Sequence, residues 1–149
     1  MINAKSFPGA KAPWHLWLVG IFALLWNGLG AVDYLMTETR NAAYLSAFTA
    51  EQIAYIDNVP KWTIATWAIG VWGGVLGGGL ILLRRRLAVP VLAASLAGAA
   101  VTFFYNFVLS NGLQAMGGAG ALVMPSVVII IGIMLLLYSR NAVRSGRLH

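Results

Sequence analysis

Four long apolar stretches constrain how this chain of 149 residues can fold more strongly than any other feature. They run over about residues 14–36, 62–83, 87–109 and 121–138. A helix of about 20 residues crosses a hydrocarbon core of about 30 Å, since each residue adds about 1.5 Å. The charged fraction of only 9% and the mean hydropathy of +0.79 agree with burial in lipid. The sequence therefore predicts an all-α integral membrane four-helix bundle, with residues 1–149 forming a single transmembrane domain.

Positive charge gathers at one end of these stretches. Of the ten Lys and Arg residues, eight follow this pattern: Lys5 and Lys11 precede the first stretch, Arg84, Arg85 and Arg86 follow the second, and Arg140, Arg144 and Arg147 follow the fourth. The four acidic residues lie at the opposite end, namely Asp33, Glu38, Glu51 and Asp57. Because Lys and Arg accumulate on the cytoplasmic side, we expect a multi-pass protein of the bacterial inner membrane with both termini in the cytoplasm.

The first stretch has a rival interpretation as a cleaved signal peptide. A basic start, an apolar run and then small residues at Gly28, Gly30 and Ala31 fit that pattern. The apolar run is, however, long enough to cross the bilayer as a helix. We therefore predict a retained membrane span.

The segment 37–60 joins the first two spans and is the only sizeable extramembrane piece that the sequence predicts. Thr49 and Gln52 fit a capping box, in which Thr49 caps a helix and Gln52 bonds back to the residue 49 backbone. Apolar side chains recur at helical spacing on both sides of Thr49. We expect two short extracytoplasmic helices that lie on the outer membrane surface or cap the bundle.

Several function classes lack the residues that they require. The net charge is +6, but basic and aromatic residues are not interleaved as in nucleic-acid-binding surfaces. Cysteine is absent, so there is no thiolate nucleophile or Cys-ligated metal. The two histidines, His15 and His149, lie too far apart for one haem or metal site. With no HExxH, GxSxG or phosphate-loop motif, we predict no catalytic residues, no metal, no cofactor, no nucleic-acid partner and no enzymatic activity.

The second span carries a row of glycines, which allow a neighbouring helix to approach closely. Static helix packing is the favoured role, and a pore or moving interface is the alternative. The partner helix could belong to the same chain or to another copy. The row consists of Gly70, Gly73, Gly74, Gly77 and Gly78.

The third span presents a small, polar stripe that should point into the bundle. It is formed by Ser95, Gly98, Thr102 and Asn106, at spacings of three and four residues. Asn27 of the first span is the expected hydrogen-bond partner of Asn106. The pair would act either as structural glue between helices or as part of a solute-lining surface.

Asp33 is the most suggestive single residue, because an ionisable group within a span is a candidate functional site. It lies near the outer end of the first span, where water, Arg40 or Lys61 could equally satisfy it as a structural anchor. As a functional site it would be a carboxylate coupled to a proton or a solute.

Three groups of residues carry a resemblance to known proteins. They lie in the first span, at the end of the third and in the loop that follows: Trp26, Asn27, Gly30, Asp33 and Tyr34; Tyr105, Asn106, Ser110, Asn111 and Gly112; and Met116, Gly117, Gly118, Ala119 and Gly120. In these motifs the chain resembles a group of small, largely uncharacterised bacterial four-span inner-membrane proteins, some of which are labelled "sugar transporter". The resemblance covers most of the chain and implies membership in an inner-membrane family, with no catalytic or binding residue to carry over.

The polar residues of these motifs cluster in the outer half of the expected bundle and could line a pocket open to the outside. The pocket candidates are Asn27, Asp33, Tyr34, Asn106, Ser110 and Asn111. We expect a small-solute transporter or channel, assembled as a homo-oligomer in the lipid bilayer because four spans seldom enclose a pathway alone. The alternative is a non-catalytic accessory subunit or assembly factor of a larger membrane complex.

Overall fold

The computed structural model describes residues 11–149, so the prediction for Lys5 lies outside the described residues. Four long helices dominate this part of the chain: α1 (Trp14–Glu38), α4 (Lys61–Leu82), α5 (Ala88–Phe104) and α7 (Val123–Arg144). A π-helical turn, Tyr105–Leu109, continues α5, and a 3₁₀ turn, Gly118–Leu122, leads into α7. Four helical stretches, Trp14–Glu38, Lys61–Leu82, Ala88–Leu109 and Gly118–Arg144, are long and apolar enough to cross a membrane. The prediction of four long apolar helices is confirmed, and residues 11–149 contain no strand.

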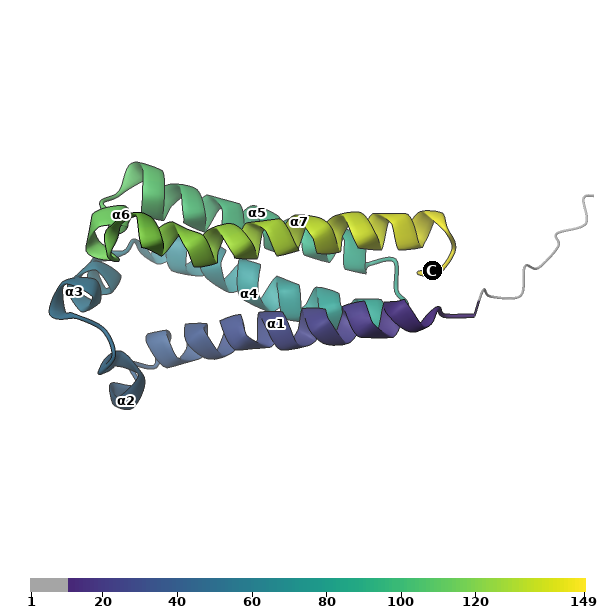
Figure 1. The fold of residues 1–149 in the computed structure, drawn as a ribbon, viewed down its shortest axis with the longest axis horizontal. Helices are drawn as coiled ribbons and strands as arrows, with labels where there is room; N and C mark the ends of the chain where they lie inside the picture. Colours follow the sequence, from purple (N-terminus) through teal and green to yellow (C-terminus); the bar gives the residue numbers. More distant parts are fainter. Residues whose placement is uncertain (1–10) are drawn as a thin grey trace, which may run out of the picture.

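Three shorter helices lie together at one end of the molecule (Figure 1): α2 (Ala42–Leu45), α3 (Ala50–Asn58) and α6 (Gly112–Ala115). The predicted capping box begins α3, since the Gln52 backbone N–H donates to Thr49 Oγ1 at 3.2 Å and the Thr49 N–H donates to Gln52 Oε1 at 2.9 Å. Arg40 forms an ion pair with Asp57 at 2.6 Å, which ties the end of α1 to α3. We call this end, with Asp33, Glu38, Glu51 and Asp57, the acidic end.

The opposite end holds the start of α1, the turn between α4 and α5, and the end of α7 (Figure 1). We call it the arginine end, because Arg84, Arg85, Arg86, Arg140, Arg144 and Arg147 lie there. The chain after α7 folds back onto the α4–α5 turn. His149 N–H donates to the Arg84 carbonyl at 2.9 Å, and Arg86 N–H donates to the His149 carbonyl at 3.2 Å. Helix α7 extends beyond residue 138, the predicted limit of the fourth span. The polar residues after Tyr138 continue the helix to Arg144, and Gly146 turns the chain away.

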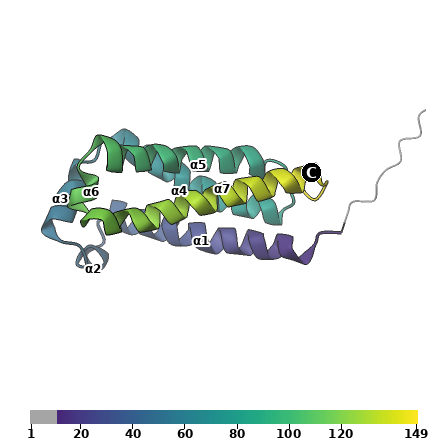
Figure 2. The same cartoon turned by 45° about the horizontal axis from the view of Figure 1, so that its top comes forward.

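The long helices pack in the order α1, α4, α5 and α7, and α7 crosses its neighbours obliquely (Figure 2). A closed ring would also require α1 to pack against α7. Within the described residues these two helices contact each other far less than the other neighbouring pairs do. They meet near the arginine end, where His15 Nδ1 and the Tyr138 hydroxyl lie 2.7 Å apart. The tightly packed core occupies the same end and includes Leu16, Ile81, Leu92, Leu135 and Leu148, each at most 5% exposed.

The glycines of α4 face two different neighbours. A Cβ atom on Gly70, Gly73 or Gly77 would meet α5, at Ala99, Ser95 and Leu92 respectively. A Cβ atom on Gly74 or Gly78 would meet α1, at Asn27 and Leu24. The close neighbours of this helix are therefore two helices of the same chain, and α4 lies between them.

Candidate functional site

Two cavities lie among α1, α4, α5 and α7. A central cavity of about 370 Å³ is lined by residues from the middle of all four helices. An acidic-end cavity of about 460 Å³ is lined by the outer parts of the same helices and by α3. Ligand pockets typically measure about 300–1,000 Å³. The two cavities share five lining residues, which makes them neighbours: Asp33, Trp67, Ala99, Met124 and Val128.

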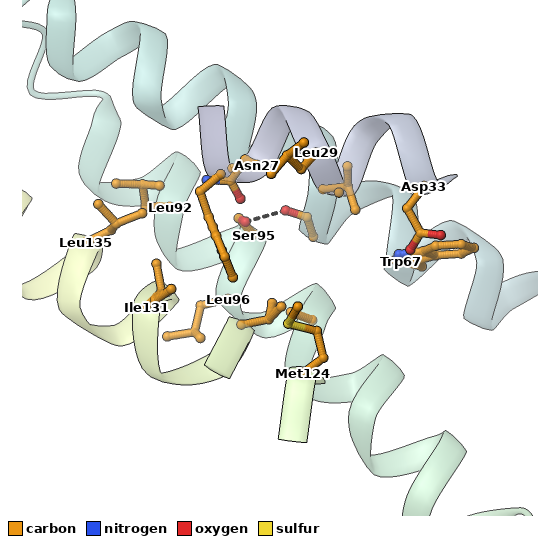
Figure 3. Close-up of a pocket in the computed structure, with 18 residues that line it drawn as sticks. Asn27, Leu29, Asp33, Trp67, Leu92, Ser95, Leu96, Met124, Ile131 and Leu135 are labelled. Carbon is orange, nitrogen blue, oxygen red and sulfur yellow. Dashed lines mark hydrogen bonds between the residues drawn. The ribbon is translucent and has the colours of Figure 1, made fainter. Parts of the chain in front are cut away.

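The central cavity is mostly apolar, and Asn27 and Ser95 in its wall are bonded to backbone carbonyls of the long helices (Figure 3). Asn27 Nδ2 donates to the Ala23 carbonyl one helical turn earlier, at 2.8 Å. Ser95 Oγ donates to the Gly70 carbonyl of the neighbouring helix. Leu92, Leu96, Ile131 and Leu135 form much of the remaining wall. This cavity is therefore suited to an apolar group.

More polar side chains line the acidic-end cavity, among them Tyr55 of α3. The Tyr55 hydroxyl donates to Asn106 Oδ1 at 2.8 Å and lies 2.7 Å from Ser110 Oγ. Burial raises the pKa of Tyr55, while its hydrogen bond to Ser110 acts in the opposite direction. These contacts dock α3 onto the π-helical turn and hold Asn106, which also lines the cavity.

Gly112 allows this docking because a side chain there would collide with it. A Cβ atom on Gly112 would lie 2.3 Å from the Asn106 carbonyl oxygen and 2.6 Å from the Tyr55 hydroxyl. Such distances are far below van der Waals contact, so Gly112 lets α6 approach Tyr55 closely.

Asp33 lines both cavities and remains exposed to solvent. Its carboxylate accepts a hydrogen bond from the Tyr44 hydroxyl of α2. Burial of the phenol, its hydrogen bond to Asp33 and the charge of that carboxylate together raise the pKa of Tyr44 to about 12. Arg40, one of the partners expected for Asp33, is instead paired with Asp57. Tyr34, the residue after Asp33, packs edge-on against Trp67 with ring centroids 5.0 Å apart.

One buried hydroxyl in the wall of the acidic-end cavity has no partner. Thr63 is only 1% exposed, and its Oγ1 makes no hydrogen bond within the described part of the chain. The neighbouring hydroxyls are satisfied, since Thr66 Oγ1 and Thr102 Oγ1 lie 2.9 Å apart. An unpaired buried hydroxyl is unfavourable. Less than 1 Å² of Thr63 Oγ1 is accessible, so the side chain must turn before this atom can meet a molecule in the cavity.

The six pocket residues expected from the sequence do not all meet at one place. Asn27 and Asp33 line the central cavity, and Asp33 and Asn106 line the acidic-end cavity. Ser110 supports the wall through Tyr55, and Tyr34 supports it through Trp67. Asn111 is exposed, precedes α6 and lines neither cavity.

The predicted hydrogen bond between Asn27 and Asn106 is wrong. Asn27 bonds to a carbonyl of its own helix, and Asn106 accepts from Tyr55. The physical reason is the order of the helices: α4 packs against both α1 and α5 and separates them. Asn27 consequently lies against Gly74 of α4, where a Cβ atom would be 2.0 Å from Asn27 Oδ1.

Sequence reasoning missed Tyr44, Tyr55, Thr63 and Trp67. Tyr55 carried a usable signal, because it lies on a short amphipathic helix whose inner face had to contact the bundle. Trp67 and Thr63 gave none, since α4 is apolar on all sides and its sequence does not reveal which face is inward.

The described residues offer no metal site, since residues 11–149 contain no group of three or more His, Cys, Asp or Glu side chains placed to hold an ion. No protein-family model, curated protein or solved structure matches the chain. The cavities themselves are therefore the basis for a functional proposal.

Proposed function

We propose that the chain is a multi-pass protein of the bacterial inner membrane, with the arginine end in the cytoplasm and the acidic end outside. The four long apolar helices support this proposal, as do the large apolar side chains that they expose, such as Leu18, Leu25 and Leu76. In water such side chains would be unfavourable, whereas in a bilayer they contact lipid. The arginine clusters at one end then follow the positive-inside rule.

We further propose that the protein binds a small solute from the outer side and transports it as a homo-oligomer. The observation that carries this proposal is the contrast between the two ends of the molecule. The two cavities lie in the middle and at the acidic end of the bundle, whereas buried side chains such as Leu16, Ile81 and Leu148 fill the arginine end. We propose that these cavities open toward the acidic end, as in an outward-facing transporter.

An accessory role in a larger membrane complex is the second candidate. It is favoured by the weak packing between α1 and α7, which leaves one side of the helix ring to be covered. Lipid would cover that side in a self-contained transporter. In an accessory subunit, a helix of another protein would cover it instead.

The mass and composition of the complex extracted from its own membrane in a mild detergent separate these two candidates. We expect a homo-oligomer of this chain alone. A stoichiometric, unrelated membrane protein in the purified complex would contradict self-contained transport and support the accessory role.

A further inference from the structure

We propose that the two cavities bind a protonated amine with a compact apolar body. The ammonium group would lie near Asp33 and Glu38 in the acidic-end cavity, and the apolar body would extend toward the central cavity. This inference rests on the proposed function, because it names the chemical class of the solute that the pocket takes up.

The charge of the cavity walls is the first argument. The chain has a net charge of +6, yet the charged side chains lining the two cavities, within residues 11–149, are the carboxylates of Asp33 and Glu38. An anion would therefore meet like charge and find no cation to pair with. A cation would instead be attracted by both carboxylates.

Aromatic rings supply the second argument. Trp67 lines both cavities, Trp26 lines the central one, and Phe103 and Phe107 line the acidic-end one. Aromatic faces attract cations and also cover apolar groups, with Trp the strongest of these partners. Asp33 and Trp67 lie side by side at one end of the central cavity (Figure 3), so charge and aromatic surface meet where the two cavities join.

Thr63 supplies the third argument and favours an amine over a quaternary ammonium ion. Its hydroxyl lies behind the wall of the acidic-end cavity and lacks a partner, and a turn of the Thr63 side chain would bring it to the ligand. A protonated amine has N–H groups that donate both to a hydroxyl oxygen and to a carboxylate, and a quaternary ammonium ion has none. Small polar groups that fix an otherwise apolar ligand are typical of ligand pockets.

The natural lack of cysteine allows a direct test. Val128 of α7 lines both cavities and is 39% exposed, so Val128→Cys places a single thiol at their junction with little change in volume. The rate at which N-ethylmaleimide modifies this thiol would be measured in lipid nanodiscs. The probes are 1-aminoadamantane, 1-adamantanol and 1-adamantanecarboxylate, which share one apolar cage and differ in charge.

We expect the amine to slow modification of Val128→Cys and the other two probes to leave it unchanged. At ten times its Kd a ligand leaves about one site in eleven free, so the rate should fall about tenfold. Asp33→Asn combined with Glu38→Gln should abolish this protection, because both substitutions keep the side-chain shape and remove the charge. Ser145→Cys, exposed at the arginine end, serves as the control thiol that no probe protects.

Each result separates this inference from the proposed function. If Val128→Cys resists modification while Ser145→Cys reacts, the pocket is inaccessible and the proposed function fails. If Val128→Cys reacts but the amine gives no more protection than the alcohol or the carboxylate, the pocket is accessible. The proposed preference for amines is then overturned. Protection by the amine that survives loss of both carboxylates would equally overturn the role of Asp33 and Glu38.

Discussion

At the scale of single residues, Gly74 and Gly79 of α4 differ in whether a side chain would fit. A Cβ atom on Gly74 would lie 2.0 Å from Asn27 Oδ1, whereas a Cβ atom on Gly79 would meet nothing within 4 Å. We expect Gly74→Ala to lower the free energy of unfolding by about 1–3 kcal/mol, because Asn27 must move. Gly79→Ala should be neutral or raise it by up to about 1 kcal/mol, since Ala favours the helix. Unfolding in mixed detergent micelles measures both.

The contact with Asn27 can be isolated with a double substitution. Asn27→Ala removes the side chain that Gly74→Ala would strike, so the cost of the second change should largely disappear in its presence. Additive effects of the two changes would show that Asn27 is not the group that requires Gly74.

Tyr55 gives a second prediction at this scale. Tyr55→Phe removes the hydroxyl that contacts Asn106 and Ser110, at 2.8 and 2.7 Å, and leaves the ring in place. We expect a loss of about 1–3 kcal/mol in the free energy of unfolding, because Asn106 and Ser110 each lose a partner. Tyr105→Phe is the matched control. The Tyr105 ring packs on Trp62 at 5.2 Å, but its hydroxyl makes no hydrogen bond within residues 11–149, so a change within about 0.5 kcal/mol is expected.

The pair of Tyr44 and Asp33 predicts a pH dependence. The raised pKa of Tyr44, about 12 against an ordinary value of 10.0, means that the folded protein holds this proton more tightly than the unfolded chain. Its contribution to stability is complete below about pH 10 and is lost as the pH rises toward 12. Difference titration of phenolate absorbance between the natural protein and Tyr44→Phe should locate this step. In Asp33→Asn the step should move to lower pH, and an unchanged step would contradict the contact.

At the scale of helices, α1, α4 and α7 end in the same backbone conformation. The residue that follows the C-cap has positive φ at Arg40, Arg84 and Gly146, with values of 53°, 57° and 69°. After α7, Gly146 N–H donates to the Val143 carbonyl at 3.0 Å and Arg147 N–H donates to the Ala142 carbonyl at 2.8 Å. This is the Schellman pattern, which ends a helix and turns the chain back. It directs the final residues onto the α4–α5 turn.

Gly146→Ala tests the importance of that turn. A left-handed conformation costs a residue with a Cβ atom about 1–2 kcal/mol more than glycine, so we expect a loss of about that size in thermal unfolding in detergent. Gly28→Ala is the control, because Gly28 lies within α1 and a Cβ atom there meets nothing within 4 Å. Equal losses in both variants would show that the penalty does not come from the turn.

The sequence predicted the helices well but not their neighbours. Apolar length predicted the four long helices, and the spacing of Thr49 and Gln52 predicted where α3 begins, because both signals are local. The pairing of Asn27 with Asn106 failed because it depended on which helices touch. Helix α4 is apolar all round, so nothing in its sequence indicated that α1 would pack on Gly74 and Gly78 while α5 packed on Gly70, Gly73 and Gly77.

The sequence predicted the candidate site about as far as it predicted the fold: individual residues were recognisable, but their partners were not. Asp33, Asn27 and Asn106 were recognisable as polar groups in apolar stretches, and all three line a cavity. Their partners were not recognisable, because Tyr44 and Tyr55 come from short helices whose docking is a long-range feature. Arg40 was a plausible partner for Asp33 by sequence proximity, but α3 brings Asp57 closer to it.

At the scale of the whole molecule, the two ends differ in both packing and charge. The arginine end is filled by buried apolar side chains, whereas the cavities lie in the middle and at the acidic end, together with Asp33 and Glu38. Under the positive-inside rule the arginine end faces the cytoplasm, so the acidic-end cavity faces the outside in the proposed orientation. The solute-binding proposal depends on that orientation.

Thiol labelling in intact cells is the measurement that tests this orientation most directly. Ser46 lies just after α2 at the acidic end and Ser145 just after α7 at the arginine end, and both are exposed. Because the chain has no cysteine of its own, Ser46→Cys and Ser145→Cys each carry a single thiol. A membrane-impermeant maleimide added to spheroplasts should label Ser46→Cys at once and Ser145→Cys only after the membrane is permeabilised. Labelling of Ser145→Cys alone in intact spheroplasts, or of both thiols equally, would contradict the outward-facing pocket.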